Sequence, residues 1–357
     1  MKFFFVVQGE GRGHMTQAIA LEEMLLSHGH QVVQVLVGKS ERRKVPQFFY
    51  DKIKAPIDTF ESPNFVTDKL NKSIDIFGTI VFNLKKQKTF FANMKKIDQF
   101  VKATNPDVIV NFYDLLAGMY SGLYKPKAKF VVVGHQYFLQ HPKFEFPKGR
   151  ALERFLVNVN SNITASRASK KLALSFRKET DYKNILVVPP LLRKEVLTLN
   201  PEAGESILGY SVNHGYGEDV QKWHANNRET KIDYFWDRPQ EAEEFAPHPN
   251  ITFHKLNDVK FLEKMRTCAG YISSAGFESI CEAMFLGKPV MMIPTEGQYE
   301  QECNAVDAVK SGAGISSKTF DLDKFKEYLP KHKSVHHEFK KWLQESENLF
   351  LKHLTEW

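Results

Sequence analysis

The segment Gly270–Ala305 constrains the fold of this 357-residue chain more than any other part. It begins with a short apolar run, Gly270–Ser273, which leads into a turn of small residues, Ser274–Gly276. A helical pattern from about Glu278 to Phe285 follows, and a second apolar run, Val290–Ile293, comes next. A strand, a tight turn, a helix and another strand in this order predict a βαβ unit of a parallel sheet.

The turn at the start of this helix is suited to an anion. The first backbone N–H groups of a helix have no partner within it and carry partial positive charge, so a phosphate or diphosphate binds there readily. Glu282 comes six residues after Gly276, about one and a half to two helical turns further on. A carboxylate there can accept hydrogen bonds from both vicinal hydroxyls of a ribose. The segment therefore predicts half of a nucleotide site. The alternative is an ordinary βαβ unit in which Gly and Pro only end the helix and the strands.

This segment resembles the donor-binding signature of GT-B glycosyltransferases, the superfamily that includes the bacterial peptidoglycan N-acetylglucosaminyltransferase. The resemblance implies an α/β fold of two Rossmann-like parallel-sheet domains facing each other across a cleft. It also implies that the donor diphosphate is held by Ser274, Gly276 and Ser279. The ribose would be held by Glu282, and the sugar by Glu300 and Gln301. Glu278 departs from the family pattern, because a carboxylate beside a diphosphate repels it.

A second glycine-containing turn lies near the amino terminus. The apolar run Lys2–Gln8 is followed at once by Gly9–His14, with the sequence GEGRGH, and then by an amphipathic helix from about Met15 to His28. The turn reads GxGxGH rather than GxGxxG, and the next apolar run, 31–37, ends without an acidic residue for an adenosine ribose. Both observations argue against a dinucleotide site.

By the same resemblance, this turn is the GT-B loop that approaches the donor sugar and the acceptor, with Gly11 and Gly13 lining it. His14 is then the candidate general base, since an imidazole can take the proton of an acceptor hydroxyl at neutral pH. The alternative is that His14 caps the helix or binds a phosphate as a polar donor.

Two more residues follow apolar runs of the first half. Asp114 comes after 108–112, at the carboxyl edge of the predicted parallel sheet, where sites gather. It is predicted to orient His14 or to act as the base itself; a helix N-cap is the alternative. His135 and Gln136 follow 130–134 and are candidate acceptor contacts; the alternative for His135 is a loop histidine satisfied by its own surroundings.

In the second half, the family resemblance adds two weaker candidates. Asn213 lies in a loop that would face the donor, after a predicted strand at 206–212. Leu256 follows the apolar run 251–254, and its backbone groups are candidates for reading the nucleotide base.

The order of elements predicts two domains. Apolar runs at 3–7, 31–37, 108–112, 129–134 and 185–188 alternate with helical patterns, as in a parallel sheet covered by helices. The first domain is predicted to span 1–190, a Pro-containing linker 191–204, and the donor domain 205–334. The helical segment at about 335–357 is predicted to pack back on the first domain.

Charge is distributed unevenly. Residues 1–190 hold 29 Lys and Arg against 16 Asp and Glu, although the whole chain has a net charge of only +7. The densest cluster, Lys69–Lys102, interleaves eight lysines with five phenylalanines. It is predicted either to lie on an anionic membrane surface or to be a solvated helix with its apolar side in the core. No nucleic-acid motif accompanies it.

Three cysteines, Cys268, Cys281 and Cys303, show no metal-ligand spacing and predict buried thiols in a reducing compartment. No apolar run reaches the roughly 18 to 20 residues that span a bilayer, and the first strand does not resemble a signal peptide. The chain is thus expected to be cytoplasmic, and peripheral attachment to the inner face of the membrane is a further hypothesis. The resemblance implies no cofactor and no metal, since GT-B chemistry stabilises the leaving diphosphate with helix N-termini and hydroxyls.

Together these features predict a glycosyltransferase of hexosyltransferase type, acting in cell-envelope or glycan biosynthesis. It would move a sugar from a nucleotide diphosphate sugar, with uridine as the favoured nucleoside, to a hydroxyl acceptor that is lipid- or glycan-linked. Inversion at the anomeric carbon is implied by the nearest families. The alternatives are a GT-B nucleotide-sugar epimerase and a non-catalytic nucleotide-binding homologue.

Overall fold

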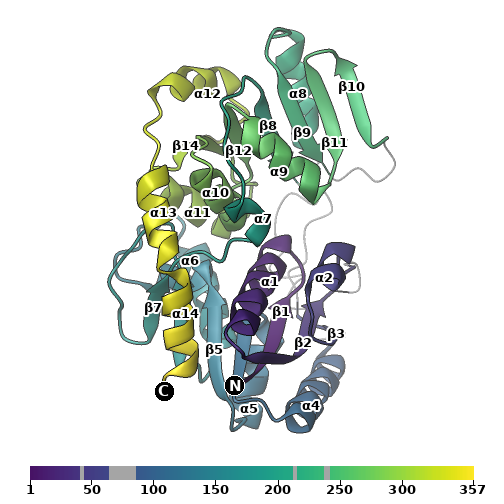
Figure 1. Ribbon diagram of the computed structural model, residues 1–357, viewed down its shortest axis with the longest axis vertical. Coiled ribbons are helices and arrows are strands. Elements are labelled where there is room, and N and C mark those ends of the chain that lie inside the picture. Colours follow the sequence, from purple (N-terminus) through teal and green to yellow (C-terminus); the bar gives the residue numbers. More distant parts are fainter. Residues whose placement is uncertain (41–43, 64–85, 212–214, 237–241) are drawn as a thin grey trace. The chain divides into compact units, whose positions relative to one another are not determined.

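The structure is a computed structural model that describes residues 1–40, 44–63, 86–211, 215–236 and 242–357. The chain forms two compact units (Figure 1). The first unit comprises residues 1–193, 296–300 and 342–357, and the second comprises 194–295 and 301–341.

The first unit is built on a seven-stranded sheet in the order β3-β2-β1-β4-β5-β6-β7, with every pair of neighbours parallel. Its strands are β1 (Lys2–Gln8), β2 (Gln31–Lys39), β3 (Ile57–Glu61), β4 (Val108–Phe112), β5 (Lys129–Gly134), β6 (Lys170–Leu174) and β7 (Ile185–Val188). The central strand β1 is fully buried from Phe3 to Val7. Such continuous apolar runs are what a parallel sheet covered on both faces requires.

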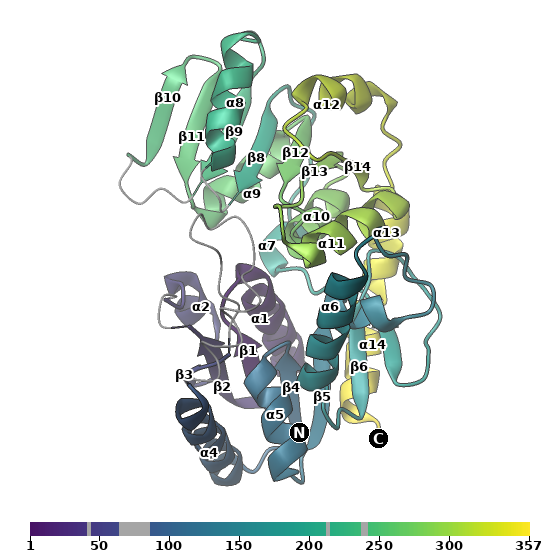
Figure 2. The same ribbon diagram turned by 180° about the vertical axis from the view of Figure 1, so that it is seen from behind.

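Helices cover both faces of this sheet. They are α1 (Arg12–Ser27), α2 (Gln47–Lys52), α4 (Gln87–Thr104), α5 (Leu115–Tyr124), the 3-10 helix η1 (His135–Gln140), α6 (Ala151–Thr164) and α14 (Ser346–Thr355). Helices α1 and α14 lie in front of the sheet in Figure 1, whereas α5 and α6 lie in front in the reverse view of Figure 2.

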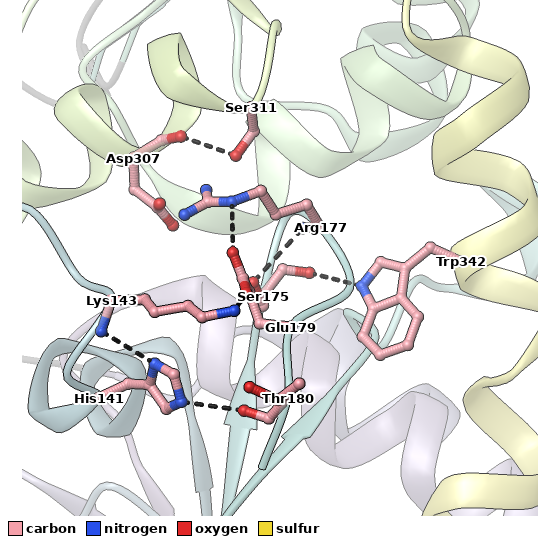
Figure 3. Close-up of polar contacts among 9 residues, drawn as sticks. All are labelled: His141, Lys143, Ser175, Arg177, Glu179, Thr180, Asp307, Ser311 and Trp342. Atoms are coloured by element: carbon pink, nitrogen blue, oxygen red, sulfur yellow. Dashed lines mark hydrogen bonds and ion pairs between the residues drawn. The ribbon is translucent and has the colours of Figure 1, made fainter. Parts of the chain in front are cut away.

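The carboxyl-terminal segment, 342–357, contacts the rest of the first unit through specific hydrogen bonds. The indole N–H of Trp342 donates a hydrogen bond of 3.0 Å to the carbonyl of Ser175, just after β6 (Figure 3). Lys170 donates from its ammonium group to the carbonyls of His353 and Glu356, at 2.9 and 2.5 Å. The last helix therefore covers the β6–β7 edge of the sheet.

Polar contacts also tie the segment after η1 to the segment after β6. His141 shares a 2.9 Å hydrogen bond with the carbonyl of Thr180, and Lys143 forms an ion pair of 2.7 Å with Glu179 (Figure 3). These contacts join the two segments, and η1 begins directly at the end of β5.

The second unit contains a seven-stranded sheet in the order β10-β11-β9-β8-β12-β13-β14, parallel except for the β10–β11 pair. Its strands are β8 (Ile207–Ser211), β9 (Ile232–Trp236), β10 (Glu244–His248), β11 (Ile251–Lys255), β12 (Gly270–Ser273), β13 (Val290–Met292) and β14 (Gly314–Ser316). Its helices are α7 (Lys194–Leu197), α8 (Gly215–Ala225), α9 (Asp258–Thr267), α10 (Phe277–Phe285), α11 (Tyr299–Lys310, which begins with the two residues assigned to the first unit), α12 (Leu322–Tyr328), η2 (Leu329–Lys331) and α13 (His336–Gln344, which ends in the first unit).

Alternate strand residues of the second sheet face different helices. Ile232 and Phe253 belong to a core that includes Val220 of α8 and Phe325 of α12. On the opposite face, the ring of Phe261 in α9 packs against neighbouring aromatic rings of the sheet, Phe235 and Tyr271, with centroids 5.4 and 5.9 Å apart. Each unit is thus a Rossmann-like, largely parallel sheet covered by helices, as the sequence predicted.

Several elements differ from the sequence prediction. Strands β3, β6, β10 and β14 were not predicted, because they are short and, in β3, β6 and β10, carry Asp, Lys or Glu among their apolar residues. The segment 191–204, predicted as a linker, contains the short helix α7, whose Val196 is fully buried. The predicted domain limits at 190, 205 and 335 stay predictions.

Only the carboxyl-terminal part of the Lys69–Lys102 cluster is described, since 64–85 lies outside the described residues. There, α4 buries the apolar side chains of its inner face in the first unit: Phe90, Met94, Ile97 and Val101. Lys88 and Lys95 are exposed, while Lys96 pairs with Asp58 at 2.9 Å. This is the core-facing alternative of the two that the sequence left open. Within the described part of the chain, no helix has the length and apolarity needed to cross a bilayer.

Candidate active site

Both sheets reverse their strand order at a point where ligands commonly bind in α/β proteins. In the first unit the reversal lies between β1 and β4, and in the second between β8 and β12. Because these strands are parallel, the residues that follow β1, β4 and β5 meet at one edge of the first sheet. His14, Asp114 and Gln136 all come from this edge, whereas Ser274 and Gly276 follow β12 in the second sheet.

Helix α1 begins earlier than predicted. Gly11 is its N-cap, in an extended conformation (φ −125°, ψ 162°) and with no side-chain cap, so Gly13 and His14 lie in the first helical turn rather than in a loop. Glycine's low helix propensity suggested a later start, but this cost is small at a helix end. A β-carbon on Gly11 would meet no atom within 4 Å. Packing therefore does not explain the glycine at this helix start.

The His14 ring is held by two glutamines. Its Nδ1 lies 3.1 Å from Oε1 of Gln17, and its Nε2 lies 3.4 Å from Nε2 of Gln136. An amide oxygen only accepts, so the proton of the neutral ring belongs on Nδ1. Nε2 then presents its lone pair, which is the arrangement that a general base requires.

Burial also keeps this imidazole neutral. Desolvation lowers the pKa of His14 from 6.5 to about 4, and the hydrogen bond to Gln17 offsets part of that effect. The ring is nevertheless half-buried rather than enclosed. At neutral pH it is therefore an uncharged base within reach of solvent.

Tyr113 forms one wall beside this ring. The two rings are stacked, with centroids 5.9 Å apart and planes at 23°, and the Tyr113 hydroxyl shares a 2.8 Å hydrogen bond with Ser161 of α6. The backbone of Tyr113 has a φ of +62°, a left-handed conformation that costs a bulky residue energy. Strain at the end of β4 thus places an aromatic ring against His14.

Asp114 is fully buried and caps α5. Its Oδ1 accepts a 2.8 Å hydrogen bond from the N–H of Ala117, and a β-carbon on Gly38 would overlap its carboxylate. Burial raises the pKa of Asp114 to about 6, while the bond from Ala117 opposes that shift. Among the described residues, the side chains bonded to the His14 ring are those of Gln17 and Gln136. The structure thus gives Asp114 the N-cap position, and its catalytic role stays a prediction.

The two residues after β5 have different surroundings. His135 is buried in an aromatic cluster, and its Nδ1 lies 2.8 Å from the carbonyl of Leu174. Gln136 contacts His14 and also donates a 2.9 Å hydrogen bond to Oε1 of Glu300. Burial raises the pKa of Glu300, and the bond from Gln136 opposes that shift. Gln136, rather than His135, therefore reaches the candidate base.

In the second unit, the turn after β12 is strained and open. Ala275 has a φ of +61°, and its N–H donates a 3.1 Å hydrogen bond to Oγ of Ser273. Gly276 is the exposed N-cap of α10, without a side-chain cap, and a β-carbon there would meet only Oγ of Ser279, at 3.6 Å. Ser274 is half-buried beside it. A helix start without a side-chain cap is a common place for a diphosphate to bind.

Helix α11 supports this turn from behind. The side-chain amide of Asn304 donates a 3.0 Å hydrogen bond to the carbonyl of Ala275, so it holds the strained residue in place. Gln301 uses its Oε1 to accept from the N–H of Thr295 at 2.8 Å. Gln301 is therefore tied to the loop before α11, and Asn304 to the turn before α10.

The remaining predicted donor residues are less open. Glu282 lies on α10, one turn beyond Ser279, and is only 3% exposed. Glu278 occupies the first turn, where a carboxylate stabilises the helix start. Leu256 is half-buried just after β11, and Asn213 lies outside the described residues.

Sequence reasoning missed Gln17 and Tyr113, and it predicted Gln136 as an acceptor contact beside His135 rather than as a partner of His14. Gln17 could have been found by its spacing, since residues three apart share a helix face. Neither the left-handed backbone of Tyr113 nor the contact of Gln136 across 122 residues leaves a mark in the local sequence.

Known proteins similar to this chain share its fold. A crystallised glycosyltransferase of kitacinnamycin is 14% identical, with a TM-score of 0.63 over 98% of this chain and 95% of its own. MurG of Acinetobacter baumannii is 14% identical, with a TM-score of 0.58 over 100% of this chain and 99% of its own. UGT2 of Phytolacca americana, solved with UDP-2-fluoro-glucose and pterostilbene, is 12% identical, with a TM-score of 0.63 over 99% of this chain and 95% of its own.

No curated protein sequence matches the chain. The profile of glycosyl transferase family 1, by contrast, matches residues 1–331, which is most of the length of this chain. The prediction of a GT-B glycosyltransferase is therefore confirmed, and the chain belongs to glycosyl transferase family 1.

Proposed function

We propose that this enzyme transfers a sugar from a uridine diphosphate sugar to a hydroxyl acceptor. The observation that carries the proposal is the open, uncapped start of α10 at Gly276, on the turn that follows the switch-point strand β12. There the diphosphate would lie against the helix N–H groups and the hydroxyls of Ser274 and Ser279. Glu282 would hold the ribose, and Glu300 and Gln301 the sugar. Solved relatives carry UDP-2-fluoro-glucose or thymidine diphosphate, which supports a pyrimidine nucleotide.

In this proposal His14 is the general base. The acceptor oxygen bonds to the anomeric carbon while the bond from that carbon to the diphosphate oxygen breaks. The electron pair of the broken bond leaves with the nucleoside diphosphate, and the hydroxyl proton passes to Nε2 of His14. A single displacement of this kind inverts the anomeric carbon. The helix start and the serine hydroxyls stabilise the departing charge, so we propose that turnover does not need a divalent cation; undiminished turnover in EDTA would support this.

Calorimetric titration with UDP, TDP, GDP and ADP tests the donor site. Selective binding of one nucleotide is expected, with an affinity that falls about tenfold or more in Glu282→Ala, because two ribose hydroxyls lose their acceptor. Glu278→Ala is the matched control on the same helix, and it should keep or increase affinity because it removes a negative charge near the diphosphate. Failure to bind any nucleotide would favour a non-catalytic homologue, and turnover of the donor without an acceptor would favour an epimerase.

The acceptor is proposed to be lipid- or glycan-linked, because the first unit is the basic part of the chain. Helix α4 uses its apolar side in the core, so its attachment to an anionic membrane would rest on charge alone. Sedimentation with vesicles of anionic lipid is expected to show binding at low salt that disappears at high salt. Binding that is absent at low salt would remove the membrane from the proposal.

A further inference from the structure

Gln136 contains a buried polar atom that has no hydrogen-bond partner among the described residues. The residue is only 5% exposed, yet its Oε1 accepts no hydrogen bond from that part of the chain, whereas its Nε2 contacts both His14 and Glu300. Leaving a buried acceptor unsatisfied is costly. An unsatisfied acceptor beside a candidate base indicates a group that a ligand completes.

The local backbone is shaped for this side chain. Gly134 precedes it in an extended conformation, and a β-carbon there would come within 2.6 Å of Oε1 of Gln136. A glycine at the end of β5 thus leaves room for the amide to lie over the sheet edge. The amide has two N–H groups and directs them to two acceptors, the Nε2 lone pair of His14 and the carboxylate of Glu300.

The two contacts differ in strength. The bond to Glu300 is 2.9 Å long and involves a carboxylate, so it is the stronger one. The contact with His14, at 3.4 Å, is long for a hydrogen bond and is readily replaced by an incoming hydroxyl. Gln136 therefore stays with Glu300 and can release the His14 nitrogen when the acceptor arrives.

We propose that Gln136 is a positioning residue that couples the base to the sugar site. Its N–H groups align His14 and Glu300, and its free Oε1 accepts a hydrogen bond from one hydroxyl of the transferred sugar. This inference rests on the proposed function, in which Glu300 contacts the sugar. The class of ligand that completes the site is a polyhydroxylated sugar with a donor hydroxyl at the matching position.

A panel of monodeoxy nucleotide sugars tests the sugar contact. With the wild-type enzyme, loss of one particular hydroxyl should raise the donor KM about tenfold, the usual cost of one hydrogen bond to a buried neutral partner. Gln136→Ala should raise the KM of the complete donor by a similar factor. It should then show no further penalty for that same deoxy sugar, because the two changes remove one interaction. The Kd of the free nucleoside diphosphate should stay within about twofold.

Gln140→Ala is the matched control, since Gln140 lies on the same 3-10 helix and bonds to Asn162 and Lys171 instead. It should leave the deoxy-sugar penalties as they are in the wild type. If every deoxy penalty persisted in Gln136→Ala, or if the Kd of the free nucleotide rose as much as the KM, the sugar contact would be refuted.

The contact with the base has a readout that needs no substrate. In proton NMR, the titration of His14 should move to higher pH in Gln136→Ala by about half a unit, because the neutral ring loses a donor and water gains access. Two titratable groups lie beside this contact: Tyr113, which stacks on the ring and whose pKa is raised by burial, and Glu300, which accepts the other bond from Gln136. An unchanged His14 titration would refute the coupling to the base. A wild-type protein that binds no nucleotide would instead refute the proposed function.

Discussion

The starts of helices α1 and α10 have similar backbone geometry but present different chemical groups: a side chain at α1 and the backbone at α10. Each follows a strand at the reversal point of its sheet, and each has a glycine N-cap, Gly11 or Gly276, where a β-carbon would meet no atom closer than 3.6 Å. At α1 the proposed chemistry belongs to one side chain, His14, whose ring contacts two glutamines and the ring of Tyr113. At α10 the proposed anion site is the backbone of the helix start, which follows the left-handed residue Ala275. In the proposed function, the same local geometry thus serves proton transfer in one unit and anion binding in the other.

Helix α5 provides the contrast within the same sheet. Its start is capped by Asp114, whose side chain accepts a hydrogen bond from the N–H of Ala117. Capping by a side chain therefore separates a structural helix start from the two that are left open.

The largest expected effect is that of His14→Ala. Loss of the proposed general base should lower kcat roughly 10²- to 10⁴-fold, while the Kd of the nucleotide changes by less than about twofold, because the proposed donor site is at the start of α10. His28→Ala, at the opposite end of α1, is the control and should retain activity. Full turnover by His14→Ala would show that His14 is not the general base and that the start of α1 does not serve proton transfer.

The pH dependence of kcat/KM distinguishes a buried base from an ordinary one. Because the pKa of His14 is lowered to about 4, its neutral form persists and the rate should be nearly constant from pH 8 down to pH 5. A histidine of ordinary pKa would lose about thirtyfold over that range. The same shift makes the protein less stable as pH falls from 6.5 toward 4, since the unfolded chain takes up the proton first. A rate that falls with a midpoint near pH 6.5 would contradict the burial argument.

Substitution of two glycines in the second unit separates packing from ligand binding. Gly276→Ala should leave the thermal midpoint almost unchanged, because its β-carbon enters open space, but should weaken nucleotide binding about tenfold by obstructing the diphosphate. Gly270→Ala should do the reverse and lower the midpoint, since its β-carbon would come within 2.7 Å of Phe325. Thermal unfolding and calorimetry measure both effects. Unchanged affinity in Gly276→Ala would mean that the open space is not where the diphosphate binds.

The smallest effect concerns the capped helix. The pKa of Asp114 is raised from 3.8 to about 6, so its contribution to stability is present below pH 4 and is lost as pH rises through 6. Asp114→Asn keeps a capping oxygen and removes the buried charge. It should therefore raise the free energy of unfolding at pH 7.5 by about 1 kcal/mol and leave kcat within about threefold. A loss of turnover comparable to that of His14→Ala would restore Asp114 as the base.

Much of the fold could be read from the sequence, because its central strands are continuous apolar runs. Strands β1, β2, β4 and β5 and the β12–α10–β13 unit lie where the residues predicted them. The edge strands β3, β10 and β14 were missed, since half-exposed strands tolerate charged residues and a short run does not distinguish them from loops.

The sequence by itself determined the family, the two glycine turns and the candidate residues within them, because turn chemistry and helix starts depend on neighbours in the chain. Only the tertiary structure decided what surrounds His14. The contact of Gln136 with both His14 and Glu300 joins residues that are 122 and 164 positions apart, and Asp114 became a cap because its buried carboxylate meets the N–H of Ala117. Tautomer, desolvation and an unsatisfied amide oxygen depend on the packing of distant segments, which local sequence patterns do not record.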